Sequence, residues 1–396
     1  KRQHDSADVV RIDPDERGDR AVPETLFGRF AEHYGAHEIE PSIHAEYLSN
    51  TAFVEWCRFQ STDELGDGGP GHYYSYEAVG EYDGLAFPWK PVGDAALSRP
   101  AAGGVRGYGE WTLDEDDWPV REPEGGDAYQ EIAVEGDPGG VGQRVLLPDW
   151  RTLGYEAALS LRTPAGADPV DSVAIRLRGP DGDLLAEATI EDIPGEDWGR
   201  FEALTLDLAA KSGETYEITS DFENLEESPY GVYDIEIVAD GTGTVGVDHV
   251  SLVPDDAVRG PRTGTPFNPT TIELMADRST TLLKWPGGNY TSTYNWERGV
   301  GPVEERPIWP NVVWNGQDPN LTGTAEYVDF CELTGVEATI TVGVTVPPED
   351  GGREFQPPDP ITPEEAANWV AYCNDDPDES EWGALRAEHG YEEPFD

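Results

Sequence analysis

The chain has 396 residues, and its 80 Asp and Glu residues against 26 Lys and Arg give a formal charge of -54 and a pI near 4.1. So strong a negative charge repels phosphate groups, which excludes nucleic acids and anionic membrane surfaces as partners. An intrinsically disordered chain could also have so acidic a composition. However, 12 Trp, 17 Tyr, 11 Phe and 37% apolar residues are enough to form folded cores, so we expect disorder only at the two ends.

The charge has a second implication, which concerns habitat. The acidic residues are scattered along the whole chain, and the basic residues are nearly all Arg. This pattern resembles proteins of extreme halophiles, in which salt screens the self-repulsion of the compact state.

The three cysteines are an odd number in a long chain and imply no disulfide framework. Cys331 and Cys373 stand in helical apolar patterns and are predicted to be core residues. The sequence contains no apolar run of membrane-spanning length. It begins at Lys1 without a secretion signal, so either a leader has been removed or the sequence begins inside the gene.

Residues 1–87 are predicted to form an N-terminal segment, with an edge strand at 9–12 and the first strand of an α/β unit at 26–30. Residues 88–126 are rich in Gly, Pro and Asp, which predicts a linker and loops. The sequence pattern changes at residues 127–255. Short alternating segments separated by turn signals predict an all-β sandwich. Its expected strands are 143–147, 155–162, 172–178, 201–207, 216–219, 232–238 and 244–252.

Residues 262–396 return to an α/β pattern. The apolar spacing predicts helices at 269–277, 324–334 and 363–373, with strands at 280–285 and 338–344. Strands that alternate with helices imply βαβ units and therefore a parallel sheet.

The most informative motif is LLKWPGGNY at residues 282–290, a short apolar strand stopped by Pro286, Gly287 and Gly288. Two glycines after a buried strand let the backbone approach a ligand, and barrel folds keep their chemistry in such loops. An ordinary Gly-rich turn is the alternative if the motif is taken alone. YNWERGVGPVEERP follows at residues 294–307 and extends the pattern.

These segments resemble the α-L-arabinofuranosidase family of retaining glycoside hydrolases. The resemblance extends upstream to LFGRFAEH at 26–33 and IHAEYLSN at 43–50. Downstream it covers TAEYVDFCELTG at 324–335, ATITVG at 338–343 and PEEAANWVAYC at 363–373. The motifs keep the family's order and spacing.

The resemblance implies that the α/β unit is the N-terminal part of a (β/α)8 TIM barrel, with about strands 1–3, and that the β-sandwich is inserted after the first strand. It also implies that Glu32 and Asn289 hydrogen bond to arabinofuranose hydroxyls, with Gly287, Gly288 and Trp296 beside them. Retaining glycosidases need two carboxyl groups about 5 Å apart. The family's Gly-Asn-Glu motif and nucleophile Glu do not occur here, and both are expected beyond Asp396.

The sandwich resembles jelly-roll carbohydrate-binding modules, particularly in VDHVSLVP at 247–254. Trp150, Trp198, Tyr230 and Tyr233 are candidates for stacking on sugar rings, and core or rim positions are the alternative for each. A structural calcium near Asp248 is a further hypothesis, since acidic oxygen-rich sites suit a hard cation. No other cofactor is implied.

Two further patterns concern a metal site and glycosylation. A zinc site is not favoured, because no His-Glu-x-x-His motif occurs and the surrounding residues indicate a strand and its loop. Its candidate ligands are His33, His37, His44, Glu38 and Glu40. Asn289 and Asn320 stand in glycosylation motifs. At Asn289 a glycan would block the pocket, and the pocket is preferred.

The first functional hypothesis is an α-L-arabinofuranosidase-type hydrolase that releases terminal α-L-arabinofuranosyl groups from plant polysaccharides or oligosaccharides by double displacement. The alternative is a non-catalytic carbohydrate-binding protein or inactive fragment. The expected partner is an arabinose-containing glycan, with a homo-oligomer open for the full-length enzyme. The location is extracellular or in the cytoplasm of a halophile, and a polysaccharide substrate favours the extracellular side.

Overall fold

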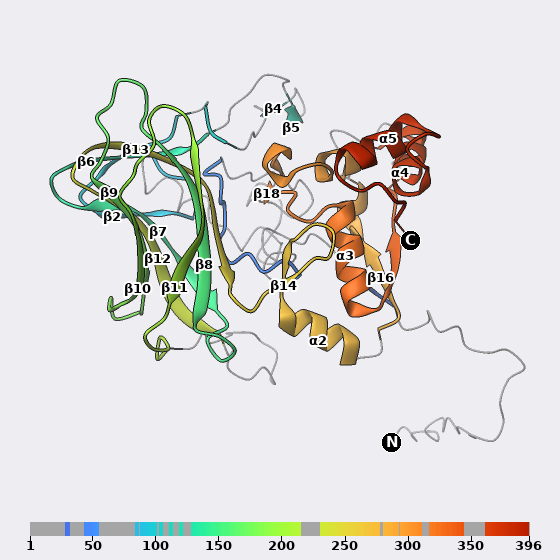
Figure 1. Ribbon diagram of the computed structural model, residues 1–396, viewed down its shortest axis with the longest axis horizontal. Helices are drawn as coiled ribbons and strands as arrows, with labels where there is room; N and C mark the ends of the chain where they lie inside the picture. Colours follow the sequence, from blue (N-terminus) through green and yellow to red (C-terminus); the bar gives the residue numbers. More distant parts are fainter. Residues whose placement is uncertain are drawn as a thin grey trace, which may run out of the picture.

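The computed structural model shows a β-sandwich beside a smaller α/β unit (Figure 1). The two units lie side by side, and a segment at residues 43–54 runs between them. The described residues are 28–31, 43–54, 84–86, 88–100, 103–105, 111–113, 119–121, 128–214, 230–277, 280–292, 294–310, 317–343 and 361–395.

The sandwich consists of two antiparallel sheets, each with five strands in the described part of the chain. The first sheet has the order β10 (Leu184–Ile190), β9 (Ser172–Arg178), β12 (Gly231–Asp240), β7 (Gly139–Leu147) and β2 (Lys90–Gly93). The second has the order β11 (Gly199–Asp207), β8 (Gly154–Arg162), β13 (Thr242–Pro254), β6 (Gln130–Glu135) and β3 (Ala96–Ser98).

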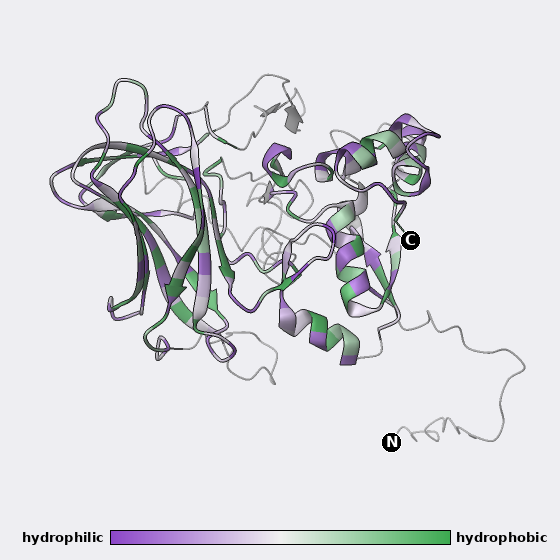
Figure 2. Cartoon of the chain, in the orientation of Figure 1, coloured by the Kyte–Doolittle hydropathy of each residue, from purple (hydrophilic) through white to green (hydrophobic). Residues whose placement is uncertain are grey.

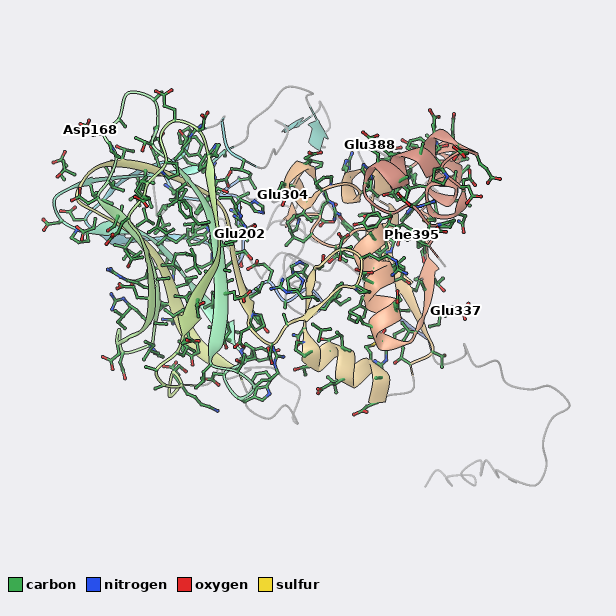
Figure 3. The ribbon with its side chains drawn as sticks, in the orientation of Figure 1. Asp168, Glu202, Glu304, Glu337, Glu388 and Phe395 are labelled. Carbon is green, nitrogen blue, oxygen red and sulfur yellow. The ribbon has the colours of Figure 1, made fainter. Side chains whose placement is uncertain are left out.

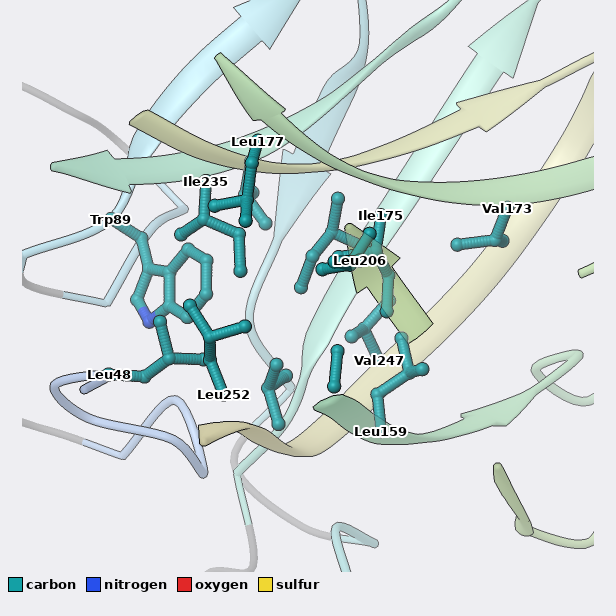
Figure 4. Packing of buried hydrophobic residues seen from close by; sticks show 14 of the residues in the cluster. Leu48, Trp89, Leu159, Val173, Ile175, Leu177, Leu206, Ile235, Val247 and Leu252 are labelled. Carbon is teal, nitrogen blue, oxygen red and sulfur yellow. The ribbon is translucent and has the colours of Figure 1, made fainter. Parts of the chain in front are cut away.

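The core of the sandwich lies between the two sheets. In β9, Val173, Ile175 and Leu177 are fully buried, while the arginines between and after them carry their charges on the outer face. This period of two is what a half-buried strand requires. Figure 4 shows Ile175 beside Leu206 of the opposite sheet, and Figure 2 shows apolar and polar residues interspersed along the strands.

Part of the stretch predicted to be linker and loops is in fact β-structure. β2 pairs with β7 and β3 pairs with β6, so residues 90–98 supply an edge strand to each sheet. β4 (Trp111–Leu113) and β5 (Pro119–Arg121) form a separate hairpin. An edge strand is paired on one side only and can be short and polar, so its hydrophobic pattern is weak. The strand predicted at 216–219 lies outside the described residues.

The α/β unit is built on a parallel sheet of three strands in the described residues, ordered β1 (Gly28–Phe30), β16 (Leu282–Trp285) and β19 (Glu337–Ile340). The parallel pairing confirms the expected βαβ arrangement. The helices are α2 (Pro269–Asp277), α3 (Thr324–Thr334), α4 (Pro363–Asn374) and α5 (Glu381–Glu388). The two short hairpins are β14 (Val258–Arg259) with β15 (Pro266–Phe267), and β17 (Trp309–Pro310) with β18 (Gln317–Asp318).

Local capping explains where the helices begin and end. At α4, the Thr362 side chain accepts a hydrogen bond from the Glu365 backbone N–H, and the Glu365 carboxylate accepts one from the Thr362 N–H. Pro363 adds a preset φ at the first helical position. α3 ends at Gly335, whose φ of 69° closes the helix in a left-handed conformation.

Aromatic side chains form the core of the α/β unit. Trp285 at the end of β16 is fully buried and stacks on Tyr327 of α3, with ring centroids 5.1 Å apart. The Tyr327 hydroxyl donates to the Leu283 carbonyl and accepts from the Thr339 N–H at 2.7 Å, so α3 is tied to both β16 and β19. Cys331 is buried in this core, as predicted for it and for Cys373.

Residues 43–54 join the two units through backbone hydrogen bonds. The Ala45 N–H donates to the Pro266 carbonyl at 2.8 Å, on the α/β side. The Tyr47 N–H donates to the Leu252 carbonyl of β13 at 3.1 Å, on the sandwich side. Ile43 packs into the α/β core and Tyr47 into the sandwich core. The segment therefore belongs to both units.

Candidate functional site

The candidate site lies at the edge of the parallel sheet where β1 and β16 end. Phe30 pairs with Lys284, and the Ala31 N–H donates to the Lys284 carbonyl at 2.8 Å, so both strands end at the same edge. Glu32 is the second residue after β1 in the sequence and lies outside the described residues. Asn289 follows β16 and begins a short 3-10 helix, η6 (Asn289–Ser292); its side chain lies outside the described residues. The two predicted sugar-binding positions therefore follow, along the sequence, two strands that are paired in the sheet.

The two glycines of the motif differ in their surroundings. The Trp285–Pro286 bond is cis, and Gly287 then adopts a φ of 125°, where an L side chain is rarely accommodated. Gly287 is buried, and its carbonyl accepts a hydrogen bond from the Thr291 hydroxyl at 2.9 Å. Gly288 is exposed. Gly287 is therefore needed for the turn, and Gly288 offers backbone to the solvent.

Two buried tyrosines lie in η6 and just after it, Tyr290 and Tyr294. Tyr290 donates its hydroxyl hydrogen bond to Asp318, whose other carboxylate oxygen accepts from the Asn320 N–H at 2.8 Å. Burial raises the pKa of Tyr290 and of Tyr294 well above the ordinary value of 10.0, so both remain neutral phenols. Both carboxylate oxygens of Asp318 accept hydrogen bonds that stabilise this loop, and we assign the residue no catalytic role.

A buried ion pair supports the same loop. Arg306 donates to both carboxylate oxygens of Glu326 on α3, at 2.8 and 3.0 Å, and also to the carbonyls of Gly301 and Asn320. Both side chains are almost fully buried. The Glu326 carboxylate also accepts from the Gly323 N–H at 2.8 Å. Glu326 is therefore a structural anchor and not a free general acid.

Trp296 does not occupy the position predicted for it. It lies in η7 (Trp296–Gly299) and is fully buried, with its indole N–H donating to the Glu365 carbonyl at 3.0 Å. Its ring is parallel to that of Trp369, with centroids 6.0 Å apart. A side chain with no exposed surface cannot contact a sugar, so Trp296 packs the core that supports the loop.

The four aromatic candidates of the sandwich separate into different roles. Tyr233 is fully buried, donates to Asp149 and accepts from the Ser212 N–H, so the structure gives it a core role. Trp198 donates to the Gly103 carbonyl at 2.8 Å, and its ring lies 4.6 Å from the Arg162 guanidinium. Trp150 is 39% exposed and meets half-buried Tyr230 edge to face at 4.7 Å.

The Asp248 carboxylate accepts hydrogen bonds from backbone N–H groups. The side chain is fully buried, and its two oxygens accept from the Val105 and His249 N–H groups at 2.5 and 2.6 Å. A calcium ion there would have to compete with these donors. Within the described ranges, no group of three His, Cys, Asp or Glu residues is placed to hold a metal ion.

The glycosylation and zinc motifs lie partly in the described residues. Asn320 is buried and its side-chain amide donates to the Pro307 carbonyl at 2.6 Å, so the prediction of a glycan acceptor at this position is wrong. His44 is buried between the two units, whereas the other residues of the zinc hypothesis, His33, His37, Glu38 and Glu40, lie outside the described residues. In the described residues, no helix is long and apolar enough to cross a bilayer.

The Tyr290–Asp318 bond and the Arg306–Glu326 pair were not foreseen. Each joins residues at least 20 positions apart, and a single sequence contains no spacing signal for such contacts. Arg306 stands in the segment 294–307 that resembles the family, but its burial and its partner Glu326 are visible only in the fold.

Comparison with known proteins supports the class that the motifs indicate. Residues 274–396 match the family model of the alpha-L-arabinofuranosidase 1 domain. An arabinose-bound α-L-arabinofuranosidase, MgGH51, superposes over 96% of this chain and 54% of its own length, with a TM-score of 0.64 and 19% identity. The resemblance to the α-L-arabinofuranosidase family is thus confirmed. The overall fold matches part of the fold of such a protein.

Individual relatives are similar over a shorter region. An intracellular exo-α-(1→5)-L-arabinofuranosidase of Halalkalibacterium halodurans is 38% identical over 128 residues, which are 32% of this chain and 23% of that protein. Alpha-L-arabinofuranosidase C of Emericella nidulans and an intracellular exo-α-(1→5)-L-arabinofuranosidase of Bacillus subtilis are each 33% identical over 129 residues, 33% of this chain and 23% of theirs. The chain thus spans about a quarter of these curated relatives.

Proposed function

We propose that this chain is part of an α-L-arabinofuranosidase-type glycoside hydrolase that removes terminal α-L-arabinofuranosyl groups from arabinose-containing glycans with retention of configuration. The observation that carries this is the shared edge of β1 and β16, where the sequence continues into Glu32 and into Pro-Gly-Gly-Asn289. In this proposal β1, β16 and β19 are the first three strands of a (β/α)8 barrel, and residues 127–255 are an inserted jelly-roll module.

The chemistry assigned to this chain is sugar positioning. A carboxylate at Glu32 accepts hydrogen bonds from ring hydroxyls, and an amide at Asn289 both donates and accepts. Such bonds orient the ring for attack at its anomeric carbon. The two catalytic carboxyl groups are not assigned to any residue of these 396, since neither family motif that carries them occurs.

The second candidate is a non-catalytic carbohydrate-binding protein, and Trp150 is the observation that favours it. A partly exposed indole braced edge to face by Tyr230 presents a flat apolar surface of the kind that sugar rings cover. If the sandwich were the working part, loss of Trp150 would abolish glycan binding while loss of Asn289 would not.

The two candidates are separated by titrating L-arabinose into the 396-residue chain in high salt. We expect Asn289→Ala and Glu32→Gln each to weaken binding about ten-fold, the cost of one hydrogen bond to a charged or polar partner. Trp150→Ala should leave arabinose binding unchanged. Asn374→Ala, an exposed Asn on α4, is the matched control. Unchanged affinity in the Asn289 and Glu32 variants would contradict the assigned sugar site.

A further inference from the structure

A cavity of about 500 Å³ lies between the sandwich and the α/β unit, and none of the functions above uses it. Its size is within the range of small-molecule sites, which occur preferentially where domains meet. We propose that this interdomain cavity binds the chain of the neutral oligosaccharide whose terminal sugar occupies the candidate site. Because it concerns the same substrate, this assignment rests on the proposed function.

The outer face of one sandwich sheet forms a wall of the cavity. Glu156 and Ala158 of β8, Arg200 and Glu202 of β11, and Ser251 of β13 all line it. Leu159, Phe201 and Leu252, which stand beside them along these strands, pack against the core, so the alternation turns Glu156, Arg200 and Ser251 toward the cavity. The sandwich therefore turns a hydrogen-bonding face toward the α/β unit.

The opposite wall comes from the loop that follows the candidate site. Glu304 lies in η8 (Val303–Glu305), in the same connection after β16 as Asn289. Figure 3 shows Glu304 on the α/β side and Glu202 on the sandwich side of the gap between the units. One wall of the cavity therefore belongs to the same connection that carries Asn289.

The charge of the walls selects a neutral ligand. Arg259 pairs with Glu156 at 3.1 Å, and Arg200 lies 3.7 Å from Glu202, so the cations of the cavity already have acidic neighbours. Glu304 adds a further carboxylate, which disfavours an anionic ligand. Exposed carboxylates beside guanidinium groups supply both acceptors and donors, and hydroxyl groups of a sugar can use both.

His44 provides an independent observation. It lines the cavity and is only 7% exposed, and its Nδ1 atom has no hydrogen-bond partner in the described part of the chain. Buried polar atoms are rarely left unsatisfied in the absence of a ligand or water. Burial also lowers the pKa of His44 to about 3, so the ring is neutral near pH 7 and offers hydrogen bonds without charge.

The test compares two ligands on variants of the full chain in high salt. The probes are α-(1→5)-linked L-arabinotetraose and free L-arabinose, titrated by calorimetry. Glu202→Ala removes a side chain that is 72% exposed, so folding is preserved, and Ala158→Trp fills the cavity. Glu187→Ala removes a carboxylate from an ion pair with Arg176 on the other sheet and is the matched control.

We expect Glu202→Ala and Ala158→Trp to weaken tetraose binding about ten-fold while leaving arabinose binding, and both affinities of Glu187→Ala, unchanged. Equal tetraose affinity in all four proteins would overturn the cavity assignment even if Asn289→Ala still weakens arabinose. A tetraose affinity that falls in the cavity variants but not in Asn289→Ala would support the cavity assignment and contradict the proposed sugar site. Absence of tetraose binding to the parent chain would overturn the cavity assignment as well.

Discussion

At the scale of single residues, the buried Arg306–Glu326 pair is a contact that cannot lose one partner without leaving the other uncompensated. The guanidinium also satisfies two backbone carbonyls, so its removal leaves a buried carboxylate without its cation and two acceptors without donors. We expect Arg306→Ala to lower the free energy of unfolding by about 3–5 kcal/mol, measured by urea denaturation in high salt.

Arg144 provides the comparison. It pairs with Asp234 at 3.1 Å on the surface of the sandwich, where the two side chains are 57% and 35% exposed. Arg144→Ala should cost less than about 1 kcal/mol. Equal costs for the two substitutions would mean that burial does not set the strength of the Arg306 pair. Arg306→Lys, which keeps the charge but not the paired geometry, should fall between them.

Glu46 predicts a specific dependence of stability on pH. Burial between the two units raises its pKa to about 7, although Leu48, Ser251 and Leu252 donate hydrogen bonds to it. The folded state therefore holds a proton that the unfolded state loses near pH 4.5, and this residue's contribution to stability falls as pH rises from about 4.5 to 7.

Glu46→Gln keeps the shape of the side chain and removes the titration. The variant should gain stability relative to the parent across that interval, by an amount on the order of 3 kcal/mol, with no further gain above pH 7. His44 acts in the opposite sense but is common to both proteins and cancels in the difference. A difference in unfolding free energy that stays constant from pH 4.5 to 7 would contradict the assignment.

At the scale of elements, the close approach of β7 and β12 depends on a glycine. Gly140 stands opposite Val238, and a Cβ atom at this position would lie 1.9 Å from the Ile237 carbonyl oxygen. Gly140→Ala must push the strands apart, and we expect a loss of about 2–3 kcal/mol in the free energy of unfolding. Gly195, whose added Cβ would meet no atom within 4 Å, is the control, and Gly195→Ala should change stability by less than about 0.5 kcal/mol.

The sequence predicted elements best where the pattern is long and half-buried. The helices at 269–277 and 324–334 and the strand at 172–178 were predicted with the bounds that the structure shows. β2 and β3 were missed because edge strands of three or four residues have little period to detect. Their place is set by pairing with β7 and β6, which is a long-range effect that local propensity does not encode.

The candidate site was predictable only in part, for a related reason. The position of Asn289 after a buried strand followed from the WPGGN motif, and the parallel pairing of β1 with β16 agrees with it. Trp296 was assigned to the sugar because it stands within the motif, yet it is fully buried. A Trp side chain suits both a core and a sugar-binding surface. Trp296 belongs to the core because Trp369 of α4 stacks on it, and the sequence alone does not indicate this contact.

At the scale of the whole molecule, the charge of -54 predicts a requirement for salt. The Debye length falls from about 10 Å at 0.1 M to about 3 Å at 1 M, so repulsion among scattered carboxylates is largely screened by molar salt. We expect the thermal midpoint to rise steeply with KCl up to about 1 M and more slowly beyond. A gain that instead grows evenly at all concentrations, and much more with sulfate than with chloride at equal ionic strength, would indicate strengthened apolar burial and not screening.

The most direct test of the proposed function is hydrolysis of an aryl α-L-arabinofuranoside in high salt, with the anomeric configuration of the released sugar followed by NMR. It should be run on these 396 residues and on the same residues extended by the downstream coding sequence. We predict no turnover by the 396 residues, and turnover with retained configuration by an extended protein that supplies the Gly-Asn-Glu and nucleophile motifs, lost on replacing Asn289. Turnover by the 396 residues alone, or inversion of configuration by the extended protein, would contradict the account.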